Sequence, residues 1–251
     1  MNVRGRAAGL LAGIVLSLAL ASTAHALTRP KVARDSNGQS VRLDGSLVLV
    51  EPDIELSLVT AGGLHEPRKD WSETARRLLP AALRRELAGR SLQLQPDFDI
   101  PDDLDPASTL GQIVRLNEAV ALSITQYSQP GSQLATKRDP RGRARMDWSL
   151  GPGVATLREA TGADYAMFVY VRDSYASGGR TALRVFGLLL GAAMGGVLDI
   201  GGGLQVGVAT IVDLRSGQVV WYNLIANQSG DLRDEDGARK TVRQVLQKLP
   251  L

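Results

Sequence analysis

Few residues of this chain have the types and spacing that catalysis needs, and histidine is the scarcest of them. The 251 residues include no cysteine and two histidines, His25 and His65. His25 lies in an N-terminal segment with the features of an export signal. A Ser-His-Asp site would have to use His65, and no Gly-x-Ser-x-Gly nucleophile motif is present. Zinc sites use several His and Cys ligands, so we expect no metal site.

Nucleotide cofactors also leave recognisable glycine patterns, and these are incomplete here. Gly201–Gly203 is followed by Val206 where a dinucleotide-binding fingerprint needs glycine. No Gly-x-x-x-x-Gly-Lys loop for phosphate is present either. We therefore expect no bound cofactor and no enzyme that depends on one.

Carboxylates are concentrated in one short acidic segment. Calcium takes six to eight oxygen ligands, usually around a tight glycine turn, and that spacing is absent. Glycosidase chemistry needs two carboxylates at a defined separation, which closeness in sequence does not establish. We favour an acidic turn in which Asp105 is the N-cap and Pro106 the first residue of a helix. A carboxylate-dependent hydrolase of envelope polysaccharide stays as the alternative function. The five carboxylates are Asp97, Asp99, Asp102, Asp103 and Asp105.

A basic run at Lys137–Arg145 holds five positive charges and one negative charge. Arg141, Arg143 and Arg145 are its candidate binding residues. They could bind lipid head groups, lipopolysaccharide phosphates or an acidic polymer. The other interpretation is a solvated loop without a ligand, and we favour it.

Three glycines recur at a spacing of four: Gly187, Gly191 and Gly195. On a helix they would form one stripe that lets another backbone approach closely, as in a self-associating or membrane-associated zipper. The alternative, which we favour, is a glycine-rich connector between strands over 187–203. The apolar stretch from Val185 to Leu198 is shorter than the roughly 20 residues that span a bilayer.

The N-terminus has the three parts of an export signal. Arg4 and Arg6 are basic, Ala7–Ala21 is apolar, and Ala24-His25-Ala26 fits a signal-peptidase site. We predict that residues 1–26 are cleaved and that the protein resides in the periplasm. Lipid attachment would require a cysteine after the signal, so we do not expect a lipoprotein.

Charge argues against a nucleic-acid partner. The chain has 29 basic and 26 acidic residues. Without the two arginines of the signal, the basic and acidic residues nearly balance, which gives no general attraction to phosphate. We expect instead an envelope protein partner, self-association, or contact with a membrane surface.

Hydrophobic patterning supplies the elements that must position these residues. Buried strands are predicted at 164–172 and 180–186, and a hairpin at 204–212 and 219–225 around a turn at 213–217. Earlier strands are predicted at 47–51 and 91–95, with 53–70 as a loop. The predicted fold class is α/β (α+β), with a mixed, largely antiparallel sheet and flanking helices. We expect an extended lead-in at 27–45 and a single domain at 46–251, with 187–203 as an insertion.

Helix signals fill the gaps between the strands. Ser72 is the predicted N-cap of a helix that reaches Gly89, with Pro80 kinking or breaking it. Further helices are predicted from Asp105 to Tyr127 and from Val154 to Thr161, the latter ending at Gly162. A final helix is predicted to start at Asp231 or Asp234 and to bury Ala238, Val242, Val245, Leu246 and Leu249.

Two short motifs resemble a known group of proteins. They are Gly162-Ala-Asp-Tyr165 and Val212-Asp-Leu-Arg-Ser-Gly-Gln-Val-Val-Trp221. Over residues 46–251 the chain resembles the envelope α/β domain of the curli-secretion lipoprotein, the activator lipoproteins of penicillin-binding proteins, the Pel secretion lipoprotein and the TolB amino-terminal domain. It differs from them in lacking a lipidated cysteine and in having the 187–203 insertion. The resemblance implies a non-enzymatic binding or assembly protein, with no catalytic residues to transfer and ring formation in some members.

Overall fold

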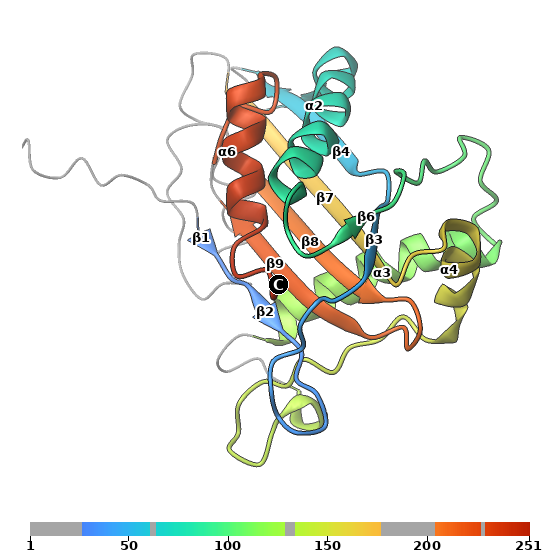
Figure 1. The fold of residues 1–251 in the computed structure, drawn as a ribbon. Coiled ribbons are helices and arrows are strands. Elements are labelled where there is room, and N and C mark those ends of the chain that lie inside the picture. Colours follow the sequence, from blue (N-terminus) through green and yellow to red (C-terminus); the bar gives the residue numbers. More distant parts are fainter. Residues whose placement is uncertain (1–26, 61–63, 129–133, 177–203, 227–228) are drawn as a thin grey trace, which may run out of the picture.

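The computed structural model describes residues 27–60, 64–128, 134–176, 204–226 and 229–251. A sheet crosses the middle of the molecule, with helices on both of its faces (Figure 1). Its strands are β1 (Leu27–Thr28), β2 (Lys31–Val32), β3 (Ser46–Leu49), β4 (Asp53–Val59), β5 (His65–Pro67), β6 (Gln93–Leu94), β7 (Tyr165–Ala176), β8 (Gln205–Asp213) and β9 (Val219–Ala226).

Strand β7 is the centre of the sheet because both of its edges are paired along most of its length. On one edge β8 runs antiparallel to it over nine residue pairs, from Tyr165↔Asp213 to Asp173↔Gln205. On the other edge β3 pairs in parallel with its first residues and β4 with its last. The predicted fold class is confirmed, since a mixed sheet with mostly antiparallel pairs is flanked by helices.

The predicted hairpin at the C-terminal end of the sheet is confirmed as β8 and β9. Gly217 N–H donates to the Asp213 carbonyl at 2.8 Å and closes the turn. Gly217 has φ +73°, and a Cβ built there would lie 2.2 Å from the Gly151 carbonyl oxygen. Glycine is therefore required at this position both by backbone conformation and by space.

Helices divide the core into two halves. One face of the sheet is covered by α2 (Lys69–Leu87) and α6 (Glu235–Val245), and the other by α3 (Thr109–Tyr127) and α4 (Ala155–Thr161). Neighbouring residues of β9 serve both halves, since strand side chains alternate between faces. Trp221 packs in the core under α2 and α6, and Tyr222 packs in the core under α3 and α4.

The prediction that residues 53–70 form a loop is wrong. This stretch contains β4 and β5 and the start of α2. The side chains of Ile54 and Leu56 are buried while Asp53 and Glu55 are exposed, which is the alternation of a half-buried strand. The glycines and prolines around this short pattern concealed it. Strand β7 also continues through 173–176, beyond its predicted end at Arg172, and its predicted partner at 180–186 lies outside the described residues.

Two predicted helix starts are also wrong, each by a few residues. Helix α2 begins at Lys69, three residues before Ser72, whose hydroxyl instead accepts from Leu56 N–H at 2.9 Å and so ties the helix to β4. Helix α3 is capped by Ser108, whose hydroxyl accepts from Gly111 N–H at 3.1 Å, and not by Asp105. Pro80 lies inside α2 without ending it.

The other helix ends follow the sequence signals. Helix α4 stops at Gly162, which has the left-handed φ of +65°. Helix α6 is capped by Asp234, whose carboxylate accepts from Gly237 N–H at 2.7 Å. Asp231, the other predicted cap, forms an ion pair with Arg233.

Candidate functional site

The basic run predicted from the sequence is folded into a tight turn. Arg138 and Ala144 pair as an antiparallel bridge, which closes the two arms of the turn. Between them the Asp139 carboxylate accepts from the N–H groups of Arg141 and Arg143, at 2.9 and 2.8 Å. The Arg143 guanidinium also binds Asp139, at 2.7 Å. These hydrogen bonds lower the pKa of Asp139, with the Arg143 N–H as the largest cause.

This turn meets the N-terminal part of the chain, about 100 residues away in sequence. Strand β2 pairs with β9 and places Lys31 and Arg34 beside the turn. The two segments enclose an open groove of about 600 Å³. We call it the basic groove and define it by Lys31, Arg34, Arg143 and Arg145. The loops that form it lie at the lower end of the molecule (Figure 1).

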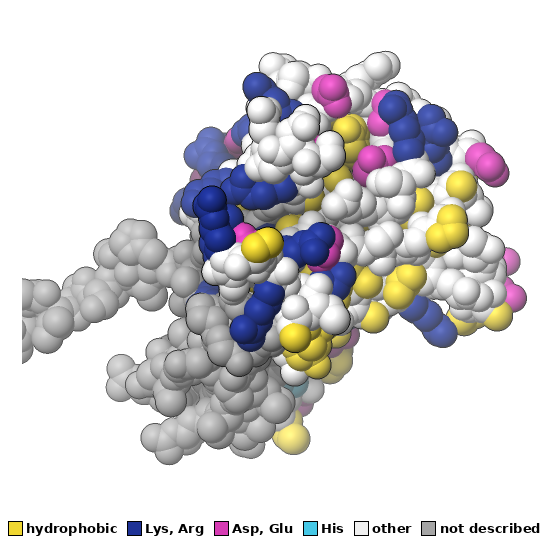
Figure 2. Space-filling view, turned by 90° about the horizontal axis from the view of Figure 1, so that it is seen from below, with side chains coloured by type: hydrophobic (Ala, Val, Ile, Leu, Met, Phe, Trp, Pro, Cys, Tyr) yellow, Lys and Arg dark blue, Asp and Glu magenta, His cyan; other side chains and the backbone are white. Residues whose placement is uncertain are grey.

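Positive charge is in excess around the basic groove. Segments 29–42 and 134–148 contain nine basic and three acidic residues. The Asp147 carboxylate is flanked by Lys137 and Arg145, each at 3.2 Å. Asp35 accepts from the backbone N–H groups of its own turn. With the acidic groups engaged locally, the excess cations can bind an anionic ligand. Figure 2 looks onto this end and shows Lys and Arg side chains gathered there.

Lys31 differs from the arginines because it is partly buried. Its ammonium donates to the Ser128 carbonyl at 3.3 Å. Burial lowers its pKa, and the neighbouring Arg29 adds to that effect. A bound anion would raise this pKa again, because it would stabilise the charged ammonium.

Sequence reasoning identified half of the basic groove. Arg143 and Arg145 line it, and Arg141 is exposed at the tip of the turn. Lys31 and Arg34 were not among the binding residues predicted from the sequence. The basic residues at 29, 31 and 34 are the sequence signal that could have identified them. The glycines Gly187, Gly191 and Gly195 lie outside the described residues.

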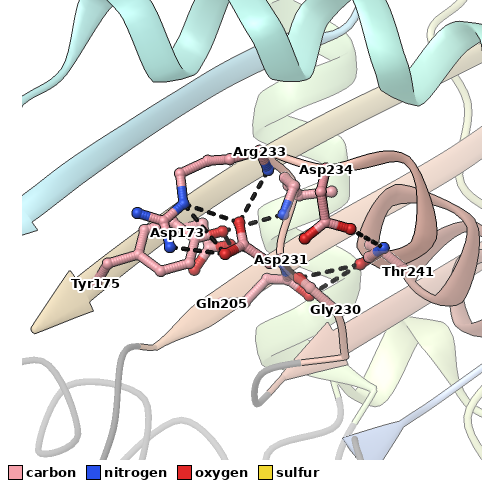
Figure 3. Close-up of polar contacts among 10 residues, drawn as sticks. Asp173, Tyr175, Gln205, Gly230, Asp231, Arg233, Asp234 and Thr241 are labelled. Atoms are coloured by element: carbon pink, nitrogen blue, oxygen red, sulfur yellow. Dashed lines mark hydrogen bonds and ion pairs between the residues drawn. The ribbon is translucent and has the colours of Figure 1, made fainter.

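A second group of polar residues is buried near the end of β7 (Figure 3). Asp173 is 2% exposed and Gln205, its partner on β8, is fully buried. The Asp173 carboxylate accepts from the Tyr175 hydroxyl at 2.7 Å and from the Gln205 amide at 2.8 Å. The Tyr175 hydroxyl accepts from Leu232 N–H at 3.1 Å, so the group joins β7, β8 and the segment before α6. We call it the Asp173 cluster, made of Asp173, Tyr175 and Gln205.

Aromatic rings close the Asp173 cluster on one side. The Arg233 guanidinium lies 3.9 Å from the Tyr175 ring centre and 4.6 Å from that of Trp71. The two rings meet edge to face at 5.6 Å. Asp231 binds the same guanidinium, at 2.6 Å. Arg233 is thereby held as a cover over the cluster.

Burial raises the pKa of Asp173 to about 6, against the opposing effect of its two hydrogen bonds. One of its carboxylate oxygens, Oδ1, is buried without a hydrogen-bond partner among the described residues. A raised pKa suits a general acid only where substrate can reach it. Asp173 is closed off from solvent, and the hydrogen bonds of the Asp173 cluster hold β7, β8 and the segment before α6 together.

The remaining candidate residues do not combine into a catalytic or metal site. His65 is exposed on β5, with its Nδ1 3.4 Å from the Ser57 hydroxyl. Asp97 forms an ion pair with Arg84 at 2.6 Å. The described part of the chain contains no group of three or more potential metal ligands. Among the helices that the structure describes, none has the length and apolar character to cross a membrane.

No family model matches the chain, and no curated protein matches it. Among solved structures it is similar to a PelC dodecamer from Paraburkholderia phytofirmans, with 13% identity and a TM-score of 0.40, covering 90% of this chain and 98% of that one. A point variant of that PelC dodecamer gives 12% identity and a TM-score of 0.39, covering 90% and 99%. The structural neighbours are thus PelC proteins, at an identity and TM-score too low to assign the chain to their family.

Proposed function

We propose that the protein is an exported, non-enzymatic binding protein of the cell envelope, and that the basic groove binds an acidic polysaccharide. The observation that carries the proposal is the meeting of two basic segments, distant in sequence, at one open groove. Arginine binds carboxylate and phosphate groups through paired N–H donors. Export to the periplasm is proposed from the N-terminal sequence, Arg4 and Arg6 followed by the apolar run and Ala24-His25-Ala26.

The shape of the groove favours a chain over a flat surface. Its floor lies between two protruding loops, and the half-buried Lys31 is part of its lining. A flat anionic membrane would contact the tips of the loops, including Arg141, before it reached Lys31. A flexible acidic glycan can lie along the groove and approach all four cations of the groove.

A binding role agrees better with the described residues than the hydrolase alternative does. Among the described carboxyl groups, the one whose pKa is raised is Asp173, and it is buried away from solvent. A glycosidase needs an acid with a raised pKa that faces the glycosidic bond. The groove carboxylate Asp139 has a lowered pKa and is held by Arg143, which suits it to ordering the turn.

The test is titration of the purified protein without its signal segment with alginate, an acidic polysaccharide, at several salt concentrations. We expect binding that weakens as salt rises, and no binding of neutral dextran. The triple variant Arg34→Gln, Arg143→Gln, Arg145→Gln should bind alginate at least fivefold more weakly, by about 1 kcal/mol or more. Phosphatidylglycerol vesicles are tested in parallel.

The matched control is the double variant Arg76→Gln, Arg77→Gln, which removes exposed positive charge from α2 on another face of the molecule. It should leave alginate binding unchanged. Equal losses in both variants would reduce the effect to overall charge and contradict the proposal. Binding to vesicles without binding to alginate would contradict the choice of ligand.

A further inference from the structure

A different pocket opens between α3 and the middle of the sheet, on the face away from α2 and α6. Its volume is about 90 Å³. Val114 and Ala121 line it from the helix, and Phe168 and Val208 line it from β7 and β8. Phe168 and Val208 are 7% and 8% exposed. Its wall is therefore hydrocarbon, which favours an apolar group over water.

Two polar atoms of the pocket lining are paired with each other. The Thr210 hydroxyl donates to the Asn117 side-chain oxygen at 2.7 Å, and both residues are buried. A hydroxyl and an amide oxygen that are already paired do not need a hydrogen bond from a ligand. An apolar group can therefore occupy the pocket without leaving these two atoms unsatisfied.

The mouth of the pocket is negatively charged. Glu51, Asp53 and Glu118 lie around it. Arg172 neutralises Asp53 through two hydrogen bonds of 2.9 Å each. Glu51 accepts from the backbone N–H of Ile100 at 3.0 Å, which adds no positive charge. No ion pair within the described part of the chain involves Glu118. Two carboxylates thus remain without a cation at the opening.

We propose that this pocket binds a small hydrophobic amine, with its hydrocarbon group between α3 and the sheet and its ammonium at Glu118 and Glu51. The volume is below that of the roughly 150 Å³ cavity that takes up benzene, so the hydrocarbon group is a branched chain of a few carbons or a ring that protrudes in part. Both neighbours of β7 and β8 in the sheet are in place, so the back wall offers no free strand edge to a peptide. This ligand is cationic, whereas the ligand proposed for the basic groove is anionic, so the two sites can fail independently.

Three probes of one shape separate the apolar and the charged contributions: 3-methylbutylamine, 3-methylbutanol and 4-methylpentanoate. Each is titrated into the protein, without its signal segment and methyl-labelled, while the NMR signals of Val114, Ala121 and Val208 are followed. The amine should bind about threefold more tightly than the alcohol, as expected for a partly exposed ion pair. The carboxylate should bind most weakly. Absence of shifts at these methyl groups, or equal affinity for amine and carboxylate, would overturn the proposal.

Variants then test whether the preference for the amine comes from the carboxylates at the mouth of the pocket. Glu118→Gln should reduce the difference between amine and alcohol, with Glu51 retaining part of it, while leaving alcohol binding unchanged. Its control is Glu73→Gln on α2, an exposed carboxylate on the opposite face, which should retain the full preference. Val114→Phe should block all three probes by filling the pocket. If Val114→Phe proves unstable, the exposed Glu118 decides, and an amine preference that Glu118→Gln leaves unchanged contradicts the inference.

Discussion

Asp173 and Asp139 are both hydrogen-bonded aspartates, yet their surroundings shift their pKa values in opposite directions. Asp173 is 2% exposed, and the loss of hydration raises its pKa although Tyr175 and Gln205 donate to it. Asp139 lies at the surface, where two backbone N–H groups and Arg143 lower its pKa. Hydrogen bonds therefore lower the pKa of a carboxyl group only when they stabilise the carboxylate more than its loss of hydration destabilises it.

The difference in burial also separates the roles of the Asp173 cluster and the basic groove. The Asp173 cluster has its donors and acceptors inside the protein, so changes there alter folding. The basic groove has its cations open to solvent, where an exposed ion pair contributes little to stability but a ligand can reach it. Charged residues of the same kinds thus serve the fold in one region and binding in the other.

The largest expected effect is that of Asp173→Asn on stability at neutral pH. The native state holds the Asp173 proton with a pKa of about 6, and the usual pKa of an exposed aspartate carboxyl is 3.8. The native state therefore binds more protons than the unfolded chain between these values. Stability from this group is full below about pH 4 and is lost as pH rises through about 6, by about 3 kcal/mol. Asn mimics the protonated form.

Urea unfolding of both proteins from pH 4 to pH 8 checks this prediction. The variant should match the wild type near pH 4 and exceed its free energy of unfolding at pH 7. It should also lack the wild-type decline between these values. A variant that is less stable at pH 7, or that keeps the same decline, would show that Asp173 is ionised without cost in the native state.

Tyr175→Phe comes next in size and acts on the same cluster. It removes the acceptor of the Leu232 N–H and a donor to Asp173. A buried N–H without a partner costs about 1–3 kcal/mol, and the pH midpoint of the Asp173 decline should move upward. The control is Tyr165→Phe, whose hydroxyl makes an exposed 3.4 Å contact with Asp44. If the two variants lose similar amounts of unfolding free energy in urea, the burial of the Tyr175 hydroxyl is not the cause of the loss.

In the basic groove the expected pattern is reversed. Arg143→Gln with Arg145→Gln should change the free energy of unfolding by less than about 0.5 kcal/mol, because both ion pairs are largely exposed. The same variant should weaken alginate binding and lower its salt dependence. Urea unfolding tests the prediction on stability and the binding titration tests the prediction on alginate affinity, both on one preparation of the variant. A large loss of stability would mean that the groove is part of the core structure.

The smallest effect is expected from Asp139→Asn. The carboxylate orders the turn through the N–H groups of Arg141 and Arg143. Amide hydrogen exchange at these two residues should therefore accelerate, while global unfolding and its decline between pH 4 and pH 7 stay as in the wild type. A changed pH decline would contradict the assignment of that decline to Asp173.

The sequence predicted the parts of the fold that depend on long local patterns. Strands β8 and β9 are buried on both faces, so most of their residues are apolar, and α6 has a clear cap and an apolar stripe. Strand β4 was missed because seven residues of alternation between prolines and glycines give a weak signal. The start of α2 was misplaced because Ser72 bonds to β4, a tertiary contact that local pattern does not contain.

The candidate sites were less predictable because each joins distant segments. The run at Lys137–Arg145 was visible, but its meeting with Lys31 and Arg34 depends on the pairing of β2 with β9. The Asp173 cluster was missed because the strand was predicted to end at Arg172. Its recognition requires knowing that the end of β7 packs against Leu232 and Arg233.

The position of β7 in the chain constrains the order in which the protein can fold. Strands β3 and β4 both need β7 as their parallel neighbour, and Ser46 bonds to Asp164 across 118 positions of sequence. During synthesis the first half of the chain therefore appears without its template. Such non-local pairing is slow, since loop closure must come first. A fragment that ends before residue 165 would leave the edges of β3 and β4 that face β7 unpaired, so this half of the sheet can form only when the last third of the chain is present.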